Sequence, residues 1–415
     1  MSDVTQNQDD MIAPVPRVTI QAFCDSPDIA ATIEAAADDR RMIKAHVRVQ
    51  AGGAPAAVAA FAQSPTPNVV ILEADRGTQD EFLENLDRLS DVCDPGTRVI
   101  VIGHVNDVLL YRELIRRGVS DYLIAPVSPV DMVRAVSSLF NEPGSTPVGR
   151  LVAVVGAKGG VGASTLAHNV AWAFSRDLQT ATVVADLDIA FGTAGLDFNQ
   201  DPPQGIAEAI FAPDRLDANV VDRLLSKCSD RLSLLAAPAV LDRTCDLTET
   251  AFDQLFDLLR SSVPCVVLDV PHVWNAWTRR ILTGADDIVI VAAPDLASLR
   301  NAKNLADLLR AVRPNDKPPR IVLNQVGLPK RPEIAPGDFA KAVGQDLEAI
   351  ISFEAQLFGT AANNGQMVAE VQPGARPAEI FTELANAIAG RAEGKQKKAG
   401  LLDPILAKFK RRKAS

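Results

Sequence analysis

LVAVVGAKGGVGASTLAHNV, residues 151–170, is the stretch of sequence that decides the fold. Its first five residues are apolar and mostly β-branched, which predicts a short buried strand. A glycine-rich turn over 156–162 follows, and Ala163-Ser164-Thr165 opens an apolar run with helix-forming composition. A strand, glycine loop and helix in this order can cradle phosphate, because glycines let backbone N–H groups turn inward and the helix N-terminus adds a positive dipole. Ser164 stands where a hydroxyl would coordinate the Mg²⁺ of a nucleotide.

The loop departs from the usual phosphate-binding pattern at one residue. That pattern ends in Gly-Lys-Ser/Thr, whereas this loop ends in Gly162-Ala163-Ser164, so the lysine that would neutralise the β- and γ-phosphates is absent. Lys158 lies earlier in the loop, in KGGVG, and this resembles the deviant Walker A loop of the MinD/ParA ATPases. The resemblance implies that Lys158 reaches across a dimer to the partner's nucleotide. The loop residues expected to contact ATP are Gly156, Lys158, Gly159, Gly160, Val161, Gly162, Ala163, Ser164 and Thr165.

Composition indicates a cytoplasmic globular protein. The chain is 47% hydrophobic, and no apolar run approaches the roughly 20 residues that span a bilayer. Its polar, acidic opening, MSDVTQNQDD, does not resemble a signal peptide. The five cysteines are scattered without a CxxC pair, which excludes a disulfide framework or a zinc site as the organising feature, and the four histidines are isolated.

The net charge of −10 is unevenly distributed. Residues 391–415 carry nine Lys/Arg and two Asp/Glu, a charge of +7, which leaves −17 for the rest of the chain. The acidic charge of the body argues against a general DNA-binding role, whereas the basic tail could bind an anionic surface. Leu401, Leu402, Ile405, Leu406 and Phe409 have helical spacing, which predicts a basic amphipathic helix on the inner membrane surface. A solvated, disordered tail is the alternative.

The first part of the chain, residues 17–140, alternates five short apolar strands with helices, which predicts a parallel, doubly wound sheet. GVSDYLIAP, residues 118–126, makes this region similar to a response-regulator receiver domain. The residues that carry receiver chemistry are replaced. Glu73 stands where the phosphoacceptor aspartate is expected, Ala125 replaces the lysine, Gly103 replaces the hydroxyl residue, and Asp25 is all that remains of the acidic pair. We therefore expect a pseudo-receiver that binds or dimerises, rather than a phosphorylation switch.

Three carboxylates in the second part of the chain complete a nucleotide site. Asp186 and Asp188 follow a predicted strand over 181–185, and Asp269 ends the strand in PCVVLD, where ligands bind in open α/β sheets. The MinD/ParA resemblance implies that Asp188 orients the attacking water, that Asp186 assists the Mg²⁺ site, and that Asp269 holds Mg²⁺ through water. It also places Asn324 at the adenine edge. The family's switch II glycine is missing, since DVPH stands at 269–272.

The predicted organisation has five parts. These are a disordered segment 1–16, a pseudo-receiver 17–140, a linker 141–150, a MinD/ParA-like nucleotide-binding domain 151–392 and the basic tail 393–415. Together with FGTAGLDF and LFGTAANNGQM, this arrangement resembles the TadZ/CpaE-type assembly proteins of Flp (tight adherence) pili.

The resemblance implies an ATP- and Mg²⁺-binding homodimer that helps to place pilus assembly proteins at a cell pole, with ATP acting mainly as a structural ligand. One alternative is an actively cycling ATPase of the MinD type, which Asp188 and Asp269 favour and Ala163 disfavours. A DNA-partition ParA protein and a phosphorylation-controlled response regulator are the others, and the acidic body and Glu73 argue against them.

Overall fold

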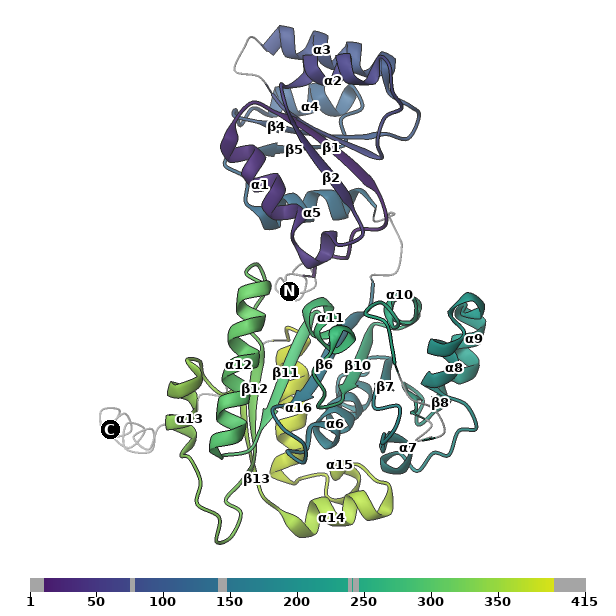
Figure 1. Ribbon diagram of the computed structural model, residues 1–415, viewed down its shortest axis with the longest axis vertical. Coiled ribbons are helices and arrows are strands. Elements are labelled where there is room, and N and C mark those ends of the chain that lie inside the picture. The colour runs from purple at the N-terminus through teal and green to yellow at the C-terminus, as the bar shows by residue number, and fades with distance from the viewer. Residues whose placement is uncertain (1–10, 75–78, 141–147, 238–240, 242–245, 392–415) are drawn as a thin grey trace, which may run out of the picture.

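The computed structural model describes residues 11–74, 79–140, 148–237, 241 and 246–391, and Figure 1 shows two α/β units, one built on each of two sheets. The expected linker over 141–147 and the basic tail lie outside the described residues. Within the described part, no helix combines the length and the apolar character that crossing a membrane requires.

The first unit is a five-stranded parallel sheet in the order β2-β1-β3-β4-β5. Its strands are β1 (Thr19–Cys24), β2 (His46–Ala51), β3 (Val69–Glu73), β4 (Arg98–Gly103) and β5 (Asp121–Ile124). One face is covered by α1 (Pro27–Ala37) and α5 (Pro129–Leu139), the other by α2 (Ala54–Phe61), α3 (Gln79–Val92) and α4 (Val108–Arg116) (Figure 1). The central strand β3 is buried along its whole length, which explains its continuous apolar run.

The expectation of disorder over residues 1–16 is wrong for residues 11–16. Ile12 and Val15 are buried in the core of the first unit, against the face that carries α1 and α5. The backbone N–H of Val15 donates to the carbonyl of Arg41, and the hydroxyl of Ser137 donates to the carbonyl of Ala13. The two prolines suggested a solvated segment, but the apolar side chains of Ile12 and Val15 anchor it to the sheet.

The second unit is an eight-stranded sheet in the order β13-β12-β11-β6-β10-β7-β9-β8, parallel except for the antiparallel edge strand β8. Its strands are β6 (Arg150–Gly156), β7 (Thr182–Asp186), β8 (Ser226–Lys227), β9 (Leu232–Leu235), β10 (Cys265–Val270), β11 (Asp287–Ala292), β12 (Arg320–Val326) and β13 (Ala349–Ser352). The glycine loop therefore follows a strand in the middle of the sheet, between β11 and β10.

Helices cover both faces of this second sheet. On one face lie α8 (Ile206–Phe211), α9 (Ala218–Leu224), α10 (Asp253–Ser262), α11 (Ala276–Gly284), α12 (Leu296–Val312) and α13 (Pro336–Val343). On the other lie α6 (Ala163–Arg176), α7 (Ala194–Asp197), α14 (Ala355–Asn364), α15 (Val368–Val371) and α16 (Arg376–Ile388). The short 3₁₀ helix η2 (Pro213–Arg215) connects α8 to α9. The predicted fold class, two doubly wound α/β units in sequence, is confirmed.

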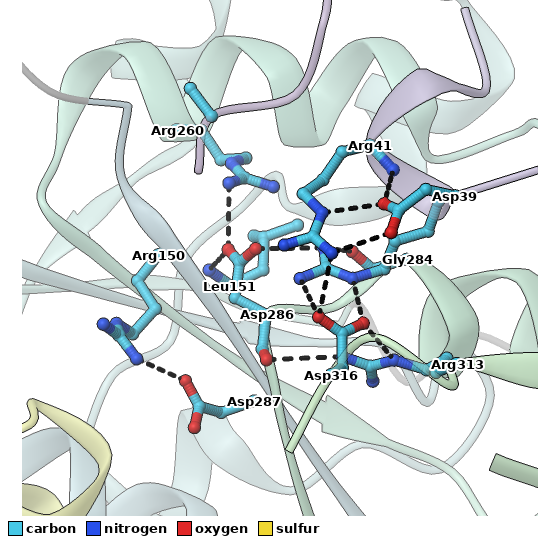
Figure 2. A network of polar contacts seen from close by, with 12 residues as sticks. Asp39, Arg41, Arg150, Leu151, Arg260, Gly284, Asp286, Asp287, Arg313 and Asp316 are labelled. Carbon is cyan, nitrogen blue, oxygen red and sulfur yellow. Dashed lines mark hydrogen bonds and ion pairs between the residues drawn. The ribbon is translucent and has the colours of Figure 1, made fainter. Parts of the chain in front are cut away.

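The two units meet through a cluster of charged side chains, which Figure 2 shows from close by. The short 3₁₀ helix η1 (Arg40–Met42) of the first unit supplies Arg40. Its guanidinium lies 2.7 Å from Oδ2 of Asp316 and 3.1 Å from Oδ1 of Asp286, and it also donates to the carbonyl of Gly284. Burial acts to raise the pKa of Asp316, but the guanidinium of Arg40 holds that pKa below its usual range.

Further arginines surround the same carboxylates. Arg260 pairs with Asp286 at 2.9 Å, and Arg313 pairs with Asp316 at 3.0 Å (Figure 2). Asp286 immediately precedes β11, and its carboxylate also accepts a hydrogen bond from the backbone N–H of Leu151 at the start of β6. The first unit therefore docks on the amino ends of the second sheet's strands, about 20 Å from their carboxyl ends at ~3.3 Å per residue.

Candidate functional site

The glycine loop leaves β6 and enters α6 with the backbone shape that its sequence predicts. Gly160 and Gly162 have φ values of 77° and 84°, which residues with a Cβ rarely adopt. At Gly156 a Cβ would stand 2.8 Å from the carbonyl oxygen of Lys158, so the tight turn requires glycine there. No side chain caps the N-terminus of α6, so its first backbone N–H groups are available to an anionic ligand.

A pocket of about 800 Å³ opens beside this loop at the carboxyl ends of the strands. Its volume lies in the range of small-molecule and cofactor sites. The predicted site residues that line it are Gly156, Lys158, Gly159, Gly160, Val161, Gly162, Ala163, Ser164, Thr165, Asp188 and Asp269. The structure thus brings together three separate segments of the chain, and it leaves two predicted residues, Asp186 and Asn324, outside the lining.

The hydroxyl of Ser164 and the carboxylate of Asp269 form a donor set that fits Mg²⁺. Both residues line the pocket, and oxygen is the ligand atom that Mg²⁺ prefers. Among the described residues, no group of three or more His, Cys, Asp or Glu side chains is placed to hold a metal ion. A nucleotide-bound Mg²⁺ does not need such a group, because phosphates and water complete its shell. The residues present therefore fit a Mg²⁺–nucleotide complex.

Asp186 does not line the pocket, and its carboxylate accepts hydrogen bonds from the segment that follows β7. Its Oδ1 accepts a hydrogen bond from the N–H of Asp188, and its Oδ2 accepts one from the N–H of Ala194, both at 3.1 Å. A Cβ on Gly192 would meet Oδ2 at 2.4 Å, so the segment after β7 wraps tightly around this carboxylate. Burial, together with the charge of Asp269, raises the pKa of Asp186. Asp186 fixes the conformation of the chain that carries Asp188.

Lys158 is held by an ion pair on its own chain. Its Nζ lies 2.6 Å from Oδ2 of Asp295, whose other oxygen caps the N-terminus of α12 by accepting from the N–H of Ser298. Burial raises the pKa of Asp295, but the hydrogen bond from Lys158 outweighs it and lowers that pKa. The lysine side chain remains 40% exposed, so it lies at the mouth of the pocket and not in its floor.

Asn324 supports the loop from behind, and its neighbour Gln325 lines the pocket instead. The amide of Asn324 donates to the carbonyl of Val161 at 2.8 Å, and its Oδ1 accepts from the N–H of Gln325. Strand β12 is irregular between Leu323 and Val326, and Gln325 has a φ of 57°. The regular in–out alternation is broken at this point, so Gln325 borders the pocket while the Asn324 side chain contacts the loop.

His168, which the sequence presented as an isolated histidine, connects two of the acidic segments. It lies on α6, is fully buried, and has Nδ1 2.8 Å from Oδ2 of Asp197 and Nε2 3.4 Å from Oδ2 of Asp269. Burial alone would lower the pKa of His168, but the two carboxylates raise it to about 10. The result is an imidazolium that orients Asp269 and fastens α7 to the helix that follows the glycine loop.

His272 belongs to the segment after β10 in which the switch II glycine of the MinD/ParA pattern is missing. Its Nδ1 lies 2.9 Å from the carbonyl oxygen of Gly156, and its exposed ring lines the pocket. This contact joins the segment after β10 to the first residue of the loop. The missing glycine was the signal in the sequence, but nothing in the sequence predicted the contact itself.

The corresponding edge of the first sheet is closed by its own hydrogen bonds. Glu73, at the end of β3, accepts from the N–H groups of Asp25 and Ser26, from the hydroxyl of Ser26, and shares a hydrogen bond with Nε2 of His104. Burial raises the pKa of Glu73, but these hydrogen bonds outweigh it and hold that pKa below its usual range. The carboxylate that stands at the phosphoacceptor position is fully occupied within the protein.

Comparison with known proteins agrees with this architecture. The family model described as an AAA domain matches residues 149–320. The chain is 29% identical over 164 residues to the septum site-determining protein MinD of Synechocystis sp., covering 39% of this chain and 60% of that protein. It thus spans less than two thirds of that relative. The solved structure of MinD from Pyrococcus horikoshii with Mg-ADP matches 61% of this chain and 98% of its own, at 16% identity and a TM-score of 0.51, which supports the fold.

Two further solved structures are closer in sequence. The pilus assembly protein CpaE of Caulobacter crescentus is 48% identical to this chain, which covers all of it with 32% of its own residues (TM-score 0.31). A CpaE2 pilus assembly protein of Sinorhizobium meliloti is 44% identical, with 100% of it and 30% of this chain covered (TM-score 0.29).

The fold and the loop define a MinD/ParA-type ATPase domain behind a smaller α/β domain. ATPases of this class bind Mg²⁺ with ATP or ADP, and they typically dimerise. Within the class, about a third of the chain is similar to two solved CpaE pilus assembly proteins, each of which is matched over its whole length.

Proposed function

We propose that this protein binds ATP with Mg²⁺, closes into a homodimer around the nucleotide, and serves as a localisation and assembly factor for a Flp-type pilus system at a cell pole. The observation that carries the proposal is the pocket at the carboxyl edge of the second sheet. It combines the uncapped N-terminus of α6 with Ser164 and Asp269, which would hold Mg²⁺. The pilus role rests on the identity to the CpaE proteins.

The proposed division of labour follows from the positions of the side chains. The loop N–H groups bind phosphate, and Mg²⁺, when bound, supplies positive charge between the phosphates. Asp188 lines the pocket and is suited to orient a water molecule. Ala163 offers no charge in the loop, so the phosphates meet few protein cations. We infer that ATP acts mainly by occupancy and that hydrolysis is slow.

Dimer formation is supported by the mouth of the pocket. Lys158 is positioned there with a half-exposed side chain, and apolar side chains surround it without cover. Phe191 and Val273 line the pocket while 70% and 49% exposed, and Leu296, next to the partner of Lys158, is 74% exposed. Apolar residues exposed around a site commonly mark a surface that another molecule covers. A second copy of the chain, presenting its own lysine, is the proposed cover.

One set of measurements on the purified protein tests the proposal. Nucleotide affinity is measured by calorimetry, turnover by phosphate release, and mass by light scattering, each with and without ATP and Mg²⁺. We expect binding, a doubling of mass with ATP, and very slow release of phosphate. Failure to bind nucleotide, or a molar mass that is the same with and without ATP, would contradict the proposal.

The second candidate function is an actively cycling ATPase for spatial positioning. It is favoured by Asp188 and Asp269, which both face the pocket. Rapid turnover in the same assay would select it. A DNA-partition role of the ParA type is disfavoured by the net charge of −10, and DNA binding that weakens steeply with salt would support it.

Association with the inner face of the plasma membrane is proposed for the basic tail, which lies outside the described residues. The full chain should sediment with anionic vesicles, and a chain lacking residues 395–415 should stay in solution. Equal sedimentation of both would contradict the proposal.

A further inference from the structure

The pocket has few cationic side chains for a site that receives a nucleotide. Four ionisable residues line it in the part of the chain that the structure describes: Lys158 from the loop, Asp188 after β7, Asp269 from β10 and His272 after β10. Two of them are acids, and Lys158 is already paired with Asp295. The loop N–H groups and the α6 dipole favour anions, but the side chains by themselves do not. Within a single chain, His272 is therefore the remaining candidate, among the described lining residues, for a further positive group beside a polyphosphate.

The contact of His272 with the loop determines which nitrogen carries a proton. The carbonyl oxygen of Gly156 can only accept, so Nδ1, 2.9 Å away, must donate. In the neutral ring, Nε2 then bears a lone pair, which would repel a phosphate oxygen. In the imidazolium, Nε2 carries a second N–H and can donate to that oxygen.

The ring of His272 has a simple polar environment. It is exposed, and the Gly156 carbonyl is its one polar contact among the described residues. The contact holds in both protonation states, because Nδ1 carries its proton in both. Gaining a proton thus alters the charge at Nε2 and leaves the placement of the ring on the loop unchanged.

We propose that His272 is a phosphate-binding residue of this site and that it takes up a proton when the nucleotide binds, in place of the charge that Ala163 removes. The inference rests on the proposed nucleotide-binding function. It predicts that nucleotide affinity is higher in mildly acidic solution and falls as pH rises through the range in which histidine loses its proton. Loss of one charge-assisted contact corresponds to roughly a 10-fold or greater fall in affinity.

The test measures protons as well as affinity. The full-length protein is titrated with Mg²⁺ and ADP, and with Mg²⁺ and a non-hydrolysable ATP analogue, in buffers of different ionisation enthalpy. His272→Asn keeps a side-chain N–H for the Gly156 carbonyl but cannot gain a proton. His272→Gly, which removes the side chain altogether, serves as a second variant. His46→Asn, an exposed histidine of the first unit, is the control.

The wild type and His46→Asn should take up more protons per bound nucleotide than either variant at His272, by up to about one proton. Their affinity should also fall more steeply between about pH 6 and about pH 8. The nucleotide's own titration is common to all four proteins and cancels in the comparison. Equal proton uptake in the wild type and both variants, with nucleotide still bound, would overturn the inference alone. Absence of nucleotide binding in every protein would overturn the proposed function together with it.

Discussion

The carboxyl edges of the two sheets each carry an acidic residue near the end of a strand. The two edges differ in whether that carboxylate is already hydrogen-bonded within the protein or borders a pocket. At the end of β3, Glu73 accepts hydrogen bonds from two backbone N–H groups, a serine hydroxyl and a histidine. At the end of β10, Asp269 contacts the buried His168, which also pairs with Asp197, and otherwise faces a pocket of about 800 Å³. Both edges lie where parallel sheets bind ligands, but the carboxylate of Glu73 is satisfied within the protein and that of Asp269 borders a pocket.

The difference shows that a doubly wound sheet does not by itself make a binding site. In the first unit, the side chain of Glu73, one methylene longer than an aspartate, reaches the β1–α1 connection. It makes hydrogen bonds there with Asp25 and Ser26 in place of bonds to a ligand. In the second unit, glycines permit the tight turn of the loop, and a pocket lies beside it at the strand ends. The experiments below alter one edge or the other.

The largest expected effect is on ATP turnover when a lysine is restored at the open edge. Removing one electrostatic donor from such a site commonly lowers the rate by about 10²–10³. Ala163→Lys should therefore raise the rate of phosphate release by a similar factor, whereas Asp188→Ala in the wild-type background should change it little. Ala163→Met, of similar length without charge, is the control. Robust hydrolysis in the wild type that Asp188→Ala abolishes would show that another group already replaces the lysine.

The next effect concerns the loop lysine. Lys158→Ala removes a charge-assisted contact worth about 1.5–3 kcal/mol, so ATP affinity should fall roughly 10- to 100-fold. ATP-dependent dimerisation, followed by light scattering, should be lost. Lys303→Ala, which removes an exposed lysine paired with Asp307 on α12, should leave both unchanged. A dimer that persists at saturating ATP in Lys158→Ala would rule out a role for this lysine across the interface.

A smaller effect is expected when the closed edge of the first sheet is opened. Glu73→Gln keeps one acceptor but loses the charge, so the first unit should lose about 1–2 kcal/mol of stability at neutral pH. The pKa of Glu73 is lowered in the folded state. Its contribution is therefore present above the ordinary carboxyl pKa and disappears as pH falls through the lowered value.

Urea unfolding of both proteins across this pH range measures the effect. The wild type should lose its advantage over Glu73→Gln in acid, and the exposed Glu84→Gln should behave as the wild type. A constant difference at every pH would mean that the carboxylate charge does not hold the edge closed.

The smallest effect concerns the contact between the units. Arg40→Ala removes two ion pairs, but Arg260 and Arg313 remain beside the same carboxylates, so the loss should be about 1 kcal/mol. Small-angle scattering should record a larger radius of gyration, while nucleotide affinity stays unchanged. The exposed Arg48→Ala is the matched control. Reduced nucleotide affinity in Arg40→Ala would show that the first unit influences the open edge from the opposite end.

Local patterns in the sequence predicted the strands, the glycine loop and the acidic residue at the end of β10. They succeeded because strand periodicity and glycine requirements depend on near neighbours. The roles that the resemblance implies for Asn324 and Asp186 stay predictions, and local patterns did not show that Asn324 holds the loop or that Asp186 accepts from the turn that follows it. They did not predict the ion pairs of His168, because its partners Asp197 and Asp269 come from other segments of the chain. The contact between Arg40 and Asp316 spans 276 residues, beyond the reach of any local pattern.

The docking of the first unit on the amino ends of β6 and β11 determines the geometry of the proposed dimer. If two pockets close on each other, the two N-terminal units point away from the interface and form the opposite tips of an elongated particle. A binding partner would then meet two identical contact points separated by the length of both ATPase domains. A scaffold with repeated docking sites at a matching spacing would be held bivalently, and a single isolated site would be held weakly. Nucleotide binding in the second unit would in this way double the number of N-terminal units that a partner can bind, and the contact surface on each unit would stay unchanged.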